Sequence, residues 1–168
     1  PLTIEMGSVS ISCFGESTGI AQIIASGGTP PYSYQWNSGH VTDVADQLSQ
    51  GVYFVDVTDA RGCVVTDSVT INENSQIINY ISSASVSCYD GSDGSATVSS
   101  SGGTGSLIYN WSTGSSNTTI TNQPFGEYWV KVEDELGCFT KDTIEISQPK
   151  PLKLQLFTTD VKCNGGSD

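Results

Sequence analysis

Apolar and polar residues alternate along several short stretches of this chain, so that every second side chain would point to one face of a strand. Between residues 51 and 59 the apolar positions are Tyr53, Val55 and Val57, and mostly polar residues lie between them. A period of two is typical of a β-strand with one packed face and one solvated face. The pattern predicts strands over residues 2–6, 8–12, 19–26, 32–37, 40–44, 51–58 and 64–71.

The whole pattern then recurs at a constant offset, so that position 1 corresponds to position 76 and position 75 to position 150. The offset links cysteines and tryptophans alike: Cys13, Cys88 and Cys163, and Trp36 and Trp111. Laying residues 1–75 on residues 76–150 without a gap gives 23 identities. We therefore expect a tandem array of two complete repeats, 1–75 and 76–150, followed by the start of a third, truncated repeat over 151–168.

Composition and turn spacing favour one fold class. The chain is rich in Ser, Thr and Gly and poor in Leu and Ala, which suits strands and turns better than helices. Segments such as Gly27–Pro31 and Asp59–Gly62 provide turns at short intervals. The sequence predicts an all-β protein of tandem Ig-like β-sandwich repeats of about 75 residues arranged end to end. Gly51 and Tyr53 lie at the start of the long predicted strand 51–58, an arrangement typical of a tyrosine corner.

Charge excludes some functions. The chain has 6 Lys and Arg against 18 Asp and Glu, which gives a formal charge of −12. Such a surface repels phosphate, so nucleic acid is not an expected partner. No run of 18 apolar residues occurs, so we expect no membrane-spanning segment. Most acidic residues differ between the two copies, which indicates a charged surface and not a charged site.

The cysteines predict disulfides in an oxidising compartment, because a domain of this size buries too little surface to be very stable alone. We expect each repeat to close its own bond, Cys13 with Cys63 and Cys88 with Cys138. Cys163 is then left unpaired by truncation. The alternative pairs Cys63 with Cys88 and Cys138 with Cys163, which would staple neighbouring repeats together. The spacing does not suit zinc, since no Cys-x-x-Cys occurs.

The positions shared by the two copies form a recognisable combination. They are Cys13, Gly27-Gly28-Thr29, Tyr34, Trp36, Gly51, Tyr53, Val55, Val57, Asp59 and Gly62-Cys63, each kept at the equivalent position of the second copy. This combination resembles the SprB repeat, over both full copies and the third fragment. The resemblance implies a very large extracellular, cell-surface adhesin of gliding bacteria of the Bacteroidota. It also implies export by the type IX secretion system and movement by the gliding machinery, which would then be partners beside the neighbouring repeats.

Candidate chemistry is sparse. His40 is the only histidine and becomes Ser115 in the second copy, so we expect no catalytic residue, no enzyme activity and no required cofactor. Asp59, which recurs in the second copy, opens an Asp-x-x-Gly segment, where Asp stabilises a turn by bonding nearby backbone.

Calcium is the one metal that the carboxylates suggest. Asp90 and Asp93 form the best local set, although the first copy keeps neither of them. Asp67 and its equivalent Asp142 share strand parity with apolar residues and would face inward. Each is then either a bulge or strand-edge carboxylate that reaches water or backbone amides, or a Ca²⁺ ligand.

Two aromatic residues suggest a ligand surface. Phe54 and its equivalent Trp129 lie on the strand face opposite to the packed tyrosines, where a covering strand, packing between repeats or a ligand would explain them. The leading hypothesis is a structural repeat of an adhesin filament that gives reach and surface attachment. The alternative is an extracellular carbohydrate-binding β-sandwich module, which would recognise polysaccharide through these aromatics and the variable segments 43–50 and 118–125.

Overall fold

The computed structural model describes residues 1–157 of the 168-residue chain, and the strands found there fall into two sets of six. The first set is β1 (Thr3–Val9), β2 (Gly19–Ser26), β3 (Ser33–Trp36), β4 (Val44–Leu48), β5 (Gly51–Thr58) and β6 (Val64–Ile71). The second set is β7 (Ile78–Ala84), β8 (Gly94–Ser101), β9 (Ile108–Trp111), β10 (Thr119–Gln123), β11 (Gly126–Glu133) and β12 (Phe139–Ile146). Every strand of the second set occupies the positions equivalent to those of its counterpart in the first, so the gapless alignment of the sequence holds in three dimensions.

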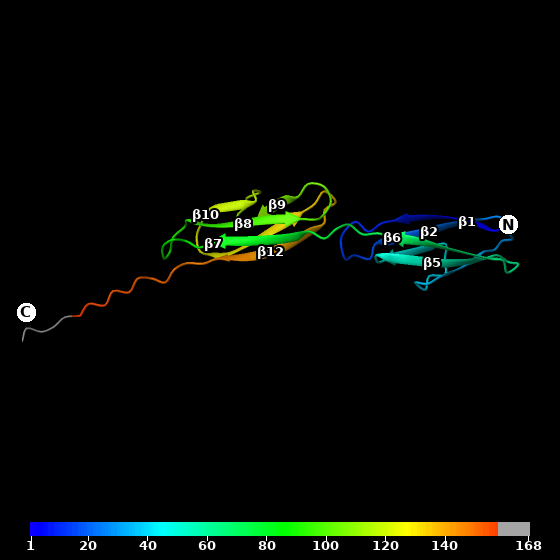
Figure 1. Cartoon of the computed structure of the whole chain (residues 1–168), viewed down its shortest axis with the longest axis horizontal. Coiled ribbons are helices and arrows are strands. Elements are labelled where there is room, and N and C mark those ends of the chain that lie inside the picture. Colours follow the sequence, from blue (N-terminus) through cyan, green and yellow to red (C-terminus); the bar gives the residue numbers. More distant parts are fainter. Residues whose placement is uncertain (158–168) are drawn as a thin grey trace, which may run out of the picture.

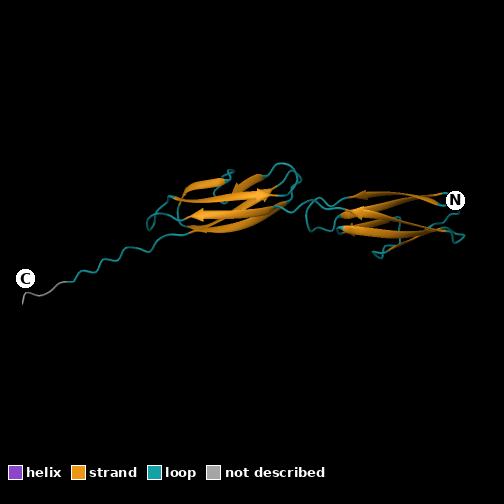
Figure 2. Ribbon diagram, viewed as in Figure 1, coloured by secondary structure: helices purple, strands orange, loops and turns teal. Residues whose placement is uncertain are grey.

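Each set forms a sandwich of two three-stranded antiparallel sheets, as the sequence predicts. In the first repeat the strand orders are β1-β2-β4 and β3-β5-β6, and in the second they are β7-β8-β10 and β9-β11-β12. These orders match the A-B-E and C-F-G sheets of an immunoglobulin-type sandwich. The all-β, Ig-like prediction is therefore confirmed by strand order. Figure 2 shows both sandwiches as strands joined by loops.

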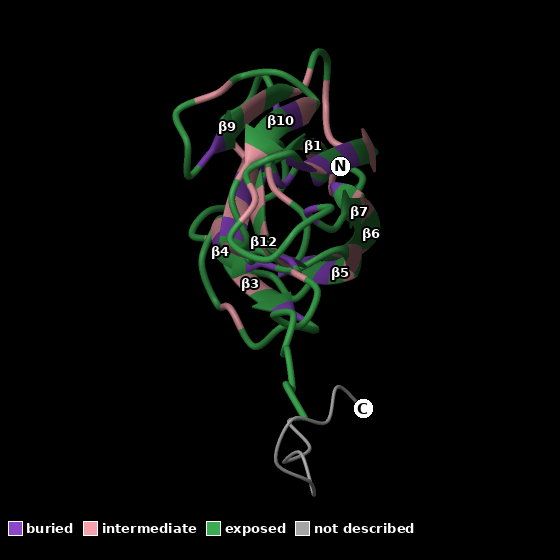
Figure 3. Ribbon diagram, turned by 90° about the vertical axis from the view of Figure 1, so that its left-hand side faces the viewer, coloured by how far each residue is buried: buried purple, intermediate pink, exposed green. Residues whose placement is uncertain are grey.

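The core of each sandwich comes from the inward positions that the alternation predicts. Trp36, Val55 and Val57 are almost completely buried, as are their equivalents in the second repeat. Figure 3, which views the molecule along its length, shows the buried positions interleaved with exposed ones on the strands. The indole Nε1 of Trp36 donates to the carbonyl of Thr42 at 2.9 Å, so burial of the ring leaves no polar atom unpaired.

The tyrosine corner is present in both repeats. The Tyr53 hydroxyl donates to the carbonyl of Ser49 at 3.0 Å, and the Tyr128 hydroxyl donates to the carbonyl of Pro124 at 2.9 Å. Each tyrosine lies at the start of the long central strand and bonds backbone four residues upstream. The bond ties the connection that crosses between the two sheets to the strand that follows it.

Two predicted strands are wrong. Residues 8–12 do not form a strand of their own, because β1 continues through Gly7 to Val9 and pairs with β2 along its whole length. Residues 40–44 are mostly a crossing loop, and the strand lies at Val44–Leu48 instead. Its register with β2 shifts between Gly19 and Ala21, which breaks the period of two. The segment 43–50, predicted as a variable ligand loop, is thus largely an edge strand whose Ala45 and Leu48 enter the core.

The two sandwiches lie end to end, and the chain beyond β12 leaves the molecule at the end opposite to the N-terminus (Figure 1). We call the end of a repeat that holds the β5–β6 or β11–β12 turn its leading end. We call the end that holds the β1–β2 or β7–β8 loop its trailing end. The trailing end of the first repeat therefore faces the leading end of the second. Within residues 1–157, no helix has the length and apolar character needed to cross a membrane.

Candidate functional site

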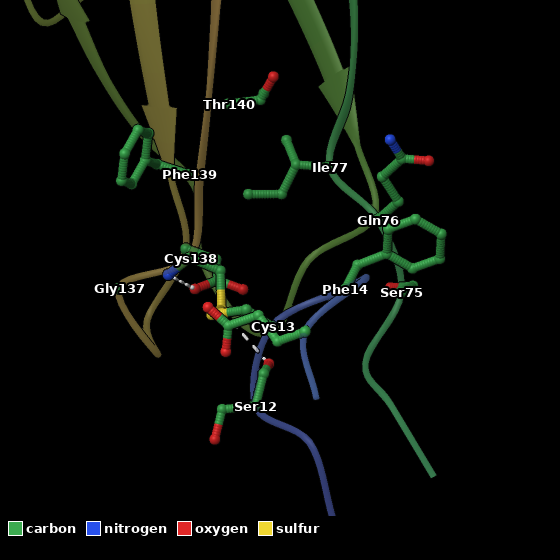
Figure 4. Close-up of a pocket in the computed structure, with 12 residues that line it drawn as sticks. Ser12, Cys13, Phe14, Ser75, Gln76, Ile77, Gly137, Cys138, Phe139 and Thr140 are labelled. Carbon is green, nitrogen blue, oxygen red and sulfur yellow. Dashed lines mark hydrogen bonds between the residues drawn. A yellow bond between two sulfur atoms is a disulfide. The ribbon is translucent and has the colours of Figure 1, made fainter. Parts of the chain in front are cut away.

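The junction between the repeats is the candidate functional site, and a disulfide spans it. Cys13, in the β1–β2 loop, bonds to Cys138, in the β11–β12 turn, with a Cα–Cα distance of 5.4 Å and a sequence separation of 125 residues. Figure 4 shows the bond passing between the trailing end of the first repeat and the leading end of the second. One covalent link therefore joins two sandwiches that are otherwise connected by a short linker.

The predicted pairing of cysteines within each repeat is wrong, and the stapling alternative is wrong as well. Cys63 precedes β6 at the leading end of its repeat, whereas Cys13 lies at the trailing end. The eight residues of β6 separate these ends by about 25 Å, and a disulfide requires Cα atoms within about 7 Å. Cys63 and Cys88 are exposed, and neither bonds another cysteine in the described part of the chain. Cys163 lies outside the described residues.

Hydrogen bonds fix the linker to both repeats. On the first repeat, Asn74 Nδ2 donates to the carbonyl of Ser12 at 2.8 Å, and Glu73 Oε2 accepts from the Gly15 amide at 2.8 Å. On the second repeat, the Gly103 amide donates to the carbonyl of Ser75 at 3.1 Å. The linker is thus bonded to a loop on each side, which restricts bending at the junction beyond what its short length would do.

Gly102 explains why the linker can approach the second repeat so closely. Its backbone is left-handed, with φ +82°, and a Cβ atom placed on it would overlap the carbonyl oxygen of Gln76. Only glycine fits both the conformation and the contact. Gly27 has the same relation to Pro1 in the first repeat, with φ +69°. The first glycine of each Gly-Gly-Thr motif therefore allows the chain that enters the repeat to pack directly against the motif's backbone.

Asp134 organises the turn that carries Cys138. Its Oδ1 accepts from the amides of Leu136 and Cys138, each at 2.9 Å, and its Oδ2 accepts from the Thr104 amide at 2.9 Å. Burial alone would raise the pKa of Asp134, but the amides of Thr104, Cys138 and Leu136 outweigh it and lower the pKa. The predicted turn role of this aspartate is confirmed.

Asp59 has the same role beside Cys63. Its carboxylate accepts from the amides of Cys63, Arg61 and Thr29 at 2.9, 2.9 and 3.0 Å. The hydrogen bond from Cys63 is the main cause that holds the pKa of Asp59 below its ordinary value, against the raising effect of burial. The turn is therefore built identically at a bonded cysteine and at a free one.

A cleft of about 290 Å³ opens beside the disulfide. Its lining includes Phe14 and Glu16 of the first repeat and Ile77 and Phe139 of the second. Figure 4 shows the two phenylalanine rings on either side of the Cys13–Cys138 bond. Phe14 and Phe139 remain 50% and 63% exposed. The two sandwiches are thus held mainly by the disulfide and the linker, and only weakly by apolar burial.

The residues predicted as calcium ligands do not come together. The Ser87 side chain, and after it the Ser87 amide that donates to Asp93 Oδ1 at 2.9 Å, lower the pKa of Asp93. The Asp90 amide instead donates to Gln148 Oε1 at 2.9 Å. In the described part of the chain, no cluster of three His, Cys, Asp or Glu residues has the geometry to hold a metal ion. Calcium binding stays a prediction, which calorimetric titration with and without EDTA would test.

Asp67 and Asp142 differ from each other, and neither is fully buried. Asp67 is exposed on the edge strand β6, where its Oδ1 accepts from the adjacent Ser68 amide at 2.8 Å. Asp142 is half-buried on β12 and accepts from Asn79 Nδ2, on β7 of the other sheet, at 2.7 Å. Because β6 and β12 are edge strands, each carboxylate can reach a hydrogen-bond donor, and neither is a buried charge without a partner.

The two aromatics predicted as a ligand surface lie on the outer face of their sheets. Phe54 is 52% exposed. Trp129 is half-buried, and the ammonium of Lys141 lies 4.1 Å from the centre of its ring. The cation covers part of the aromatic face, so Phe54 and Trp129 offer different surfaces to any ligand. Carbohydrate recognition at these residues stays a prediction.

Comparison with known families identifies the repeat. The model of the SprB repeat matches residues 8–41 and residues 81–116. This chain contains two SprB repeats. Each matched segment runs from the trailing-end loop, with Cys13 or Cys88, through the buried tryptophan. The matches end before Cys63 and Cys138, so the second cysteine of each copy lies outside the matched part of the SprB repeats.

Other comparisons add little. A search of curated proteins gives no match. Among solved structures, one titled "Structure of amphioxus IgVJ-C2 molecule" matches at 10% identity, covering 86% of this chain and 97% of that chain, with a TM-score of 0.34. The Ig-like fold assignment rests on the strand order of the two repeats.

Proposed function

We propose that this chain is a structural segment of a large, secreted cell-surface adhesin filament, in which SprB repeats give reach between the cell and an external surface. SprB repeats are typical of cell-surface adhesins, and a disulfide suits an extracellular setting. By the same resemblance, the type IX secretion system would export the protein and the gliding machinery would carry it.

The observation that carries the proposal is the Cys13–Cys138 bond across the junction. A chain pulled from its two ends transmits force through covalent bonds, and this bond provides a path that bypasses the residues between the two cysteines. Those residues include five of the six strands of each sandwich, all except β1 and β12. The segment can therefore bear tension without most of its fold being loaded.

The bypass has a measurable size. About 125 residues lie within the closed loop, and an extended chain spans up to about 3.4 Å per residue. The disulfide therefore hides roughly 400 Å of contour length. A pair of disulfides within the repeats would hide two shorter loops instead, each of roughly 50 residues.

Single-molecule force spectroscopy on the full chain, held at its two termini, tests this proposal. With the disulfide intact, we expect the chain to resist extension beyond the short segments outside the loop. Reduction should release about 400 Å more, and Cys13→Ser should reproduce the reduced behaviour without reductant. The matched control is Cys63→Ser, which removes a free thiol. Equal contour lengths before and after reduction would contradict a tension-bearing role.

A further inference from the structure

The repeat symmetry gives the two free thiols a defined relation to the bonded ones. Cys63 is the counterpart of Cys138 on a leading end, and Cys88 is the counterpart of Cys13 on a trailing end. Both free thiols are exposed, and neither is bonded to another cysteine within residues 1–157. They lie at the two outer ends of the pair of sandwiches.

The loop that carries Cys88 has the conformation of the loop that carries Cys13. In the first repeat, Glu73 Oε2 accepts from the Gly15 amide at 2.8 Å. In the second, Gln148 Oε1 accepts from the Asp90 amide at 2.9 Å, and both partners occupy the equivalent positions of the second repeat. The trailing-end loop is thus already folded as it is where the disulfide forms.

The backbone next to this loop repeats the same way. The Ile11 amide donates to the carbonyl of Asn72 at 2.8 Å, and the Val86 amide donates to the carbonyl of Ser147 at 3.0 Å. These bonds place the cysteine loop against the end of the last strand, from which the chain continues toward the next repeat. The position of Cys88 relative to the outgoing chain therefore matches that of Cys13.

The turn that carries Cys63 likewise has the conformation of the turn that carries Cys138. The Cys63 amide donates to Asp59 at 2.9 Å, as the Cys138 amide does to Asp134. Gly62 has φ +80°, and its counterpart Gly137 has φ +83°. Neither free thiol needs a rearrangement of its backbone to meet a partner.

We infer that Cys63 and Cys88 are covalent docking sites for further SprB repeats, so that each trailing-end cysteine bonds the leading-end cysteine of the repeat that follows. Cys88 would bond the leading-end turn of a third repeat, and Cys63 would bond the trailing-end loop of a repeat before the first. The Cys13–Cys138 bond is then one of a series of equivalent disulfides, one at each junction between repeats. The inference rests on the proposed role as an array segment.

The chemistry is a two-step thiol–disulfide exchange with a small disulfide, such as oxidised glutathione, as the oxidant. One cysteine thiolate attacks the small disulfide, forms a mixed disulfide and releases one thiol. The second cysteine then displaces the remaining small thiol. Two protein thiols become one disulfide, and one small disulfide becomes two thiols, so electrons and protons balance.

The test extends the full chain by one further copy of residues 1–150 at its N-terminus, in a Cys163→Ser background. This arrangement sets Cys88 of the first copy and Cys63 of the second at the same 125-residue separation as Cys13 and Cys138. After oxidation with glutathione, the free thiols are titrated and the disulfides are mapped by mass spectrometry under non-reducing conditions.

We expect a new bond between Cys88 of the first copy and Cys63 of the second, and half as many free thiols as independent pairs of repeats would retain. The matched control is Cys88→Ser in the first copy only, which should leave Cys63 of the second copy as a free thiol. Persistence of all the free thiols, or disulfides that join two Cys63 or two Cys88 residues of different chains, would overturn the inference of a disulfide at each junction. Neither result would affect the contour length hidden by Cys13–Cys138, so failure here is distinguishable from failure of the proposed function.

Discussion

Replacing Cys13 with serine removes the bond between the repeats, and the structure sets the size of the effect on stability. When the second sandwich unfolds alone, the first still holds Cys13 beside the start of the linker, because the Ile11 amide is bonded to Asn72. The disulfide then closes a free loop that runs from Asn72 to Cys138. When the first sandwich unfolds alone, a loop of similar length runs from Cys13 to the linker.

Each of these loops has about 65 residues, for which the chain-entropy relation gives a stabilisation of about 4 kcal/mol. Each sandwich, unfolding while its neighbour stays folded, should therefore lose about 4 kcal/mol of unfolding free energy in Cys13→Ser. For a domain of about 75 residues this corresponds to a fall in melting temperature of roughly 20 °C. The two repeats should respond together, although the substituted residue belongs to only one of them.

The assay is urea denaturation and calorimetry of the parent chain and Cys13→Ser, with free thiols alkylated in both. Cys63→Ser is the matched control, because Cys63 is the free counterpart of Cys138 and its loss should change the unfolding free energy by less than about 0.5 kcal/mol. The reasoning is refuted if Cys13→Ser stays within about 1 kcal/mol of the parent. An equal loss in Cys63→Ser would show that the bond lies within the first repeat.

Individual side chains give three further predictions. The pKa of Asp59 is lowered in the folded state, so its contribution to folding stability is complete above its unfolded pKa near 4 and is lost as pH falls through the folded pKa. Asp59→Asn should therefore flatten the acid limb of a curve of unfolding free energy against pH. Tyr128→Phe should cost about 1 kcal/mol in denaturant titration, because it removes the hydrogen bond of the tyrosine corner. Gly102→Ala should cost about 2 kcal/mol more than Gly114→Ala in the same assay, since both have φ +82° but only Gly102 abuts the linker.

The sequence predicts the fold well because the information is local and is present twice. The alternation over Tyr53, Val55 and Val57 identifies a central strand, and the fixed offset transfers every assignment to the second copy. The strand at Val44–Leu48 escapes this reasoning for a physical reason. A shift in its register with β2 interrupts the period of two, and Gln47 takes a left-handed φ of 51° there.

The disulfide could not be predicted from the spacing of cysteines alone. Cys13 and Cys63 share a repeat, which suggests a bond between them, but the alternation says nothing about which end of a sandwich each residue occupies. Strand order supplies that information. A cysteine just before β6 and one just after β1 lie at opposite ends, and only the neighbouring repeat brings a suitable partner close. The signal that the sequence offers is the position of each cysteine relative to the strand ends.

The most direct test of the central claim is disulfide mapping of the oxidised full chain, by proteolysis without reduction and mass spectrometry of the crosslinked peptides. The account predicts one peptide pair that joins Cys13 to Cys138 in a monomer, with Cys63 and Cys88 recovered as alkylated thiols. A peptide pair that joins Cys13 to Cys63, or Cys88 to Cys138, would contradict it.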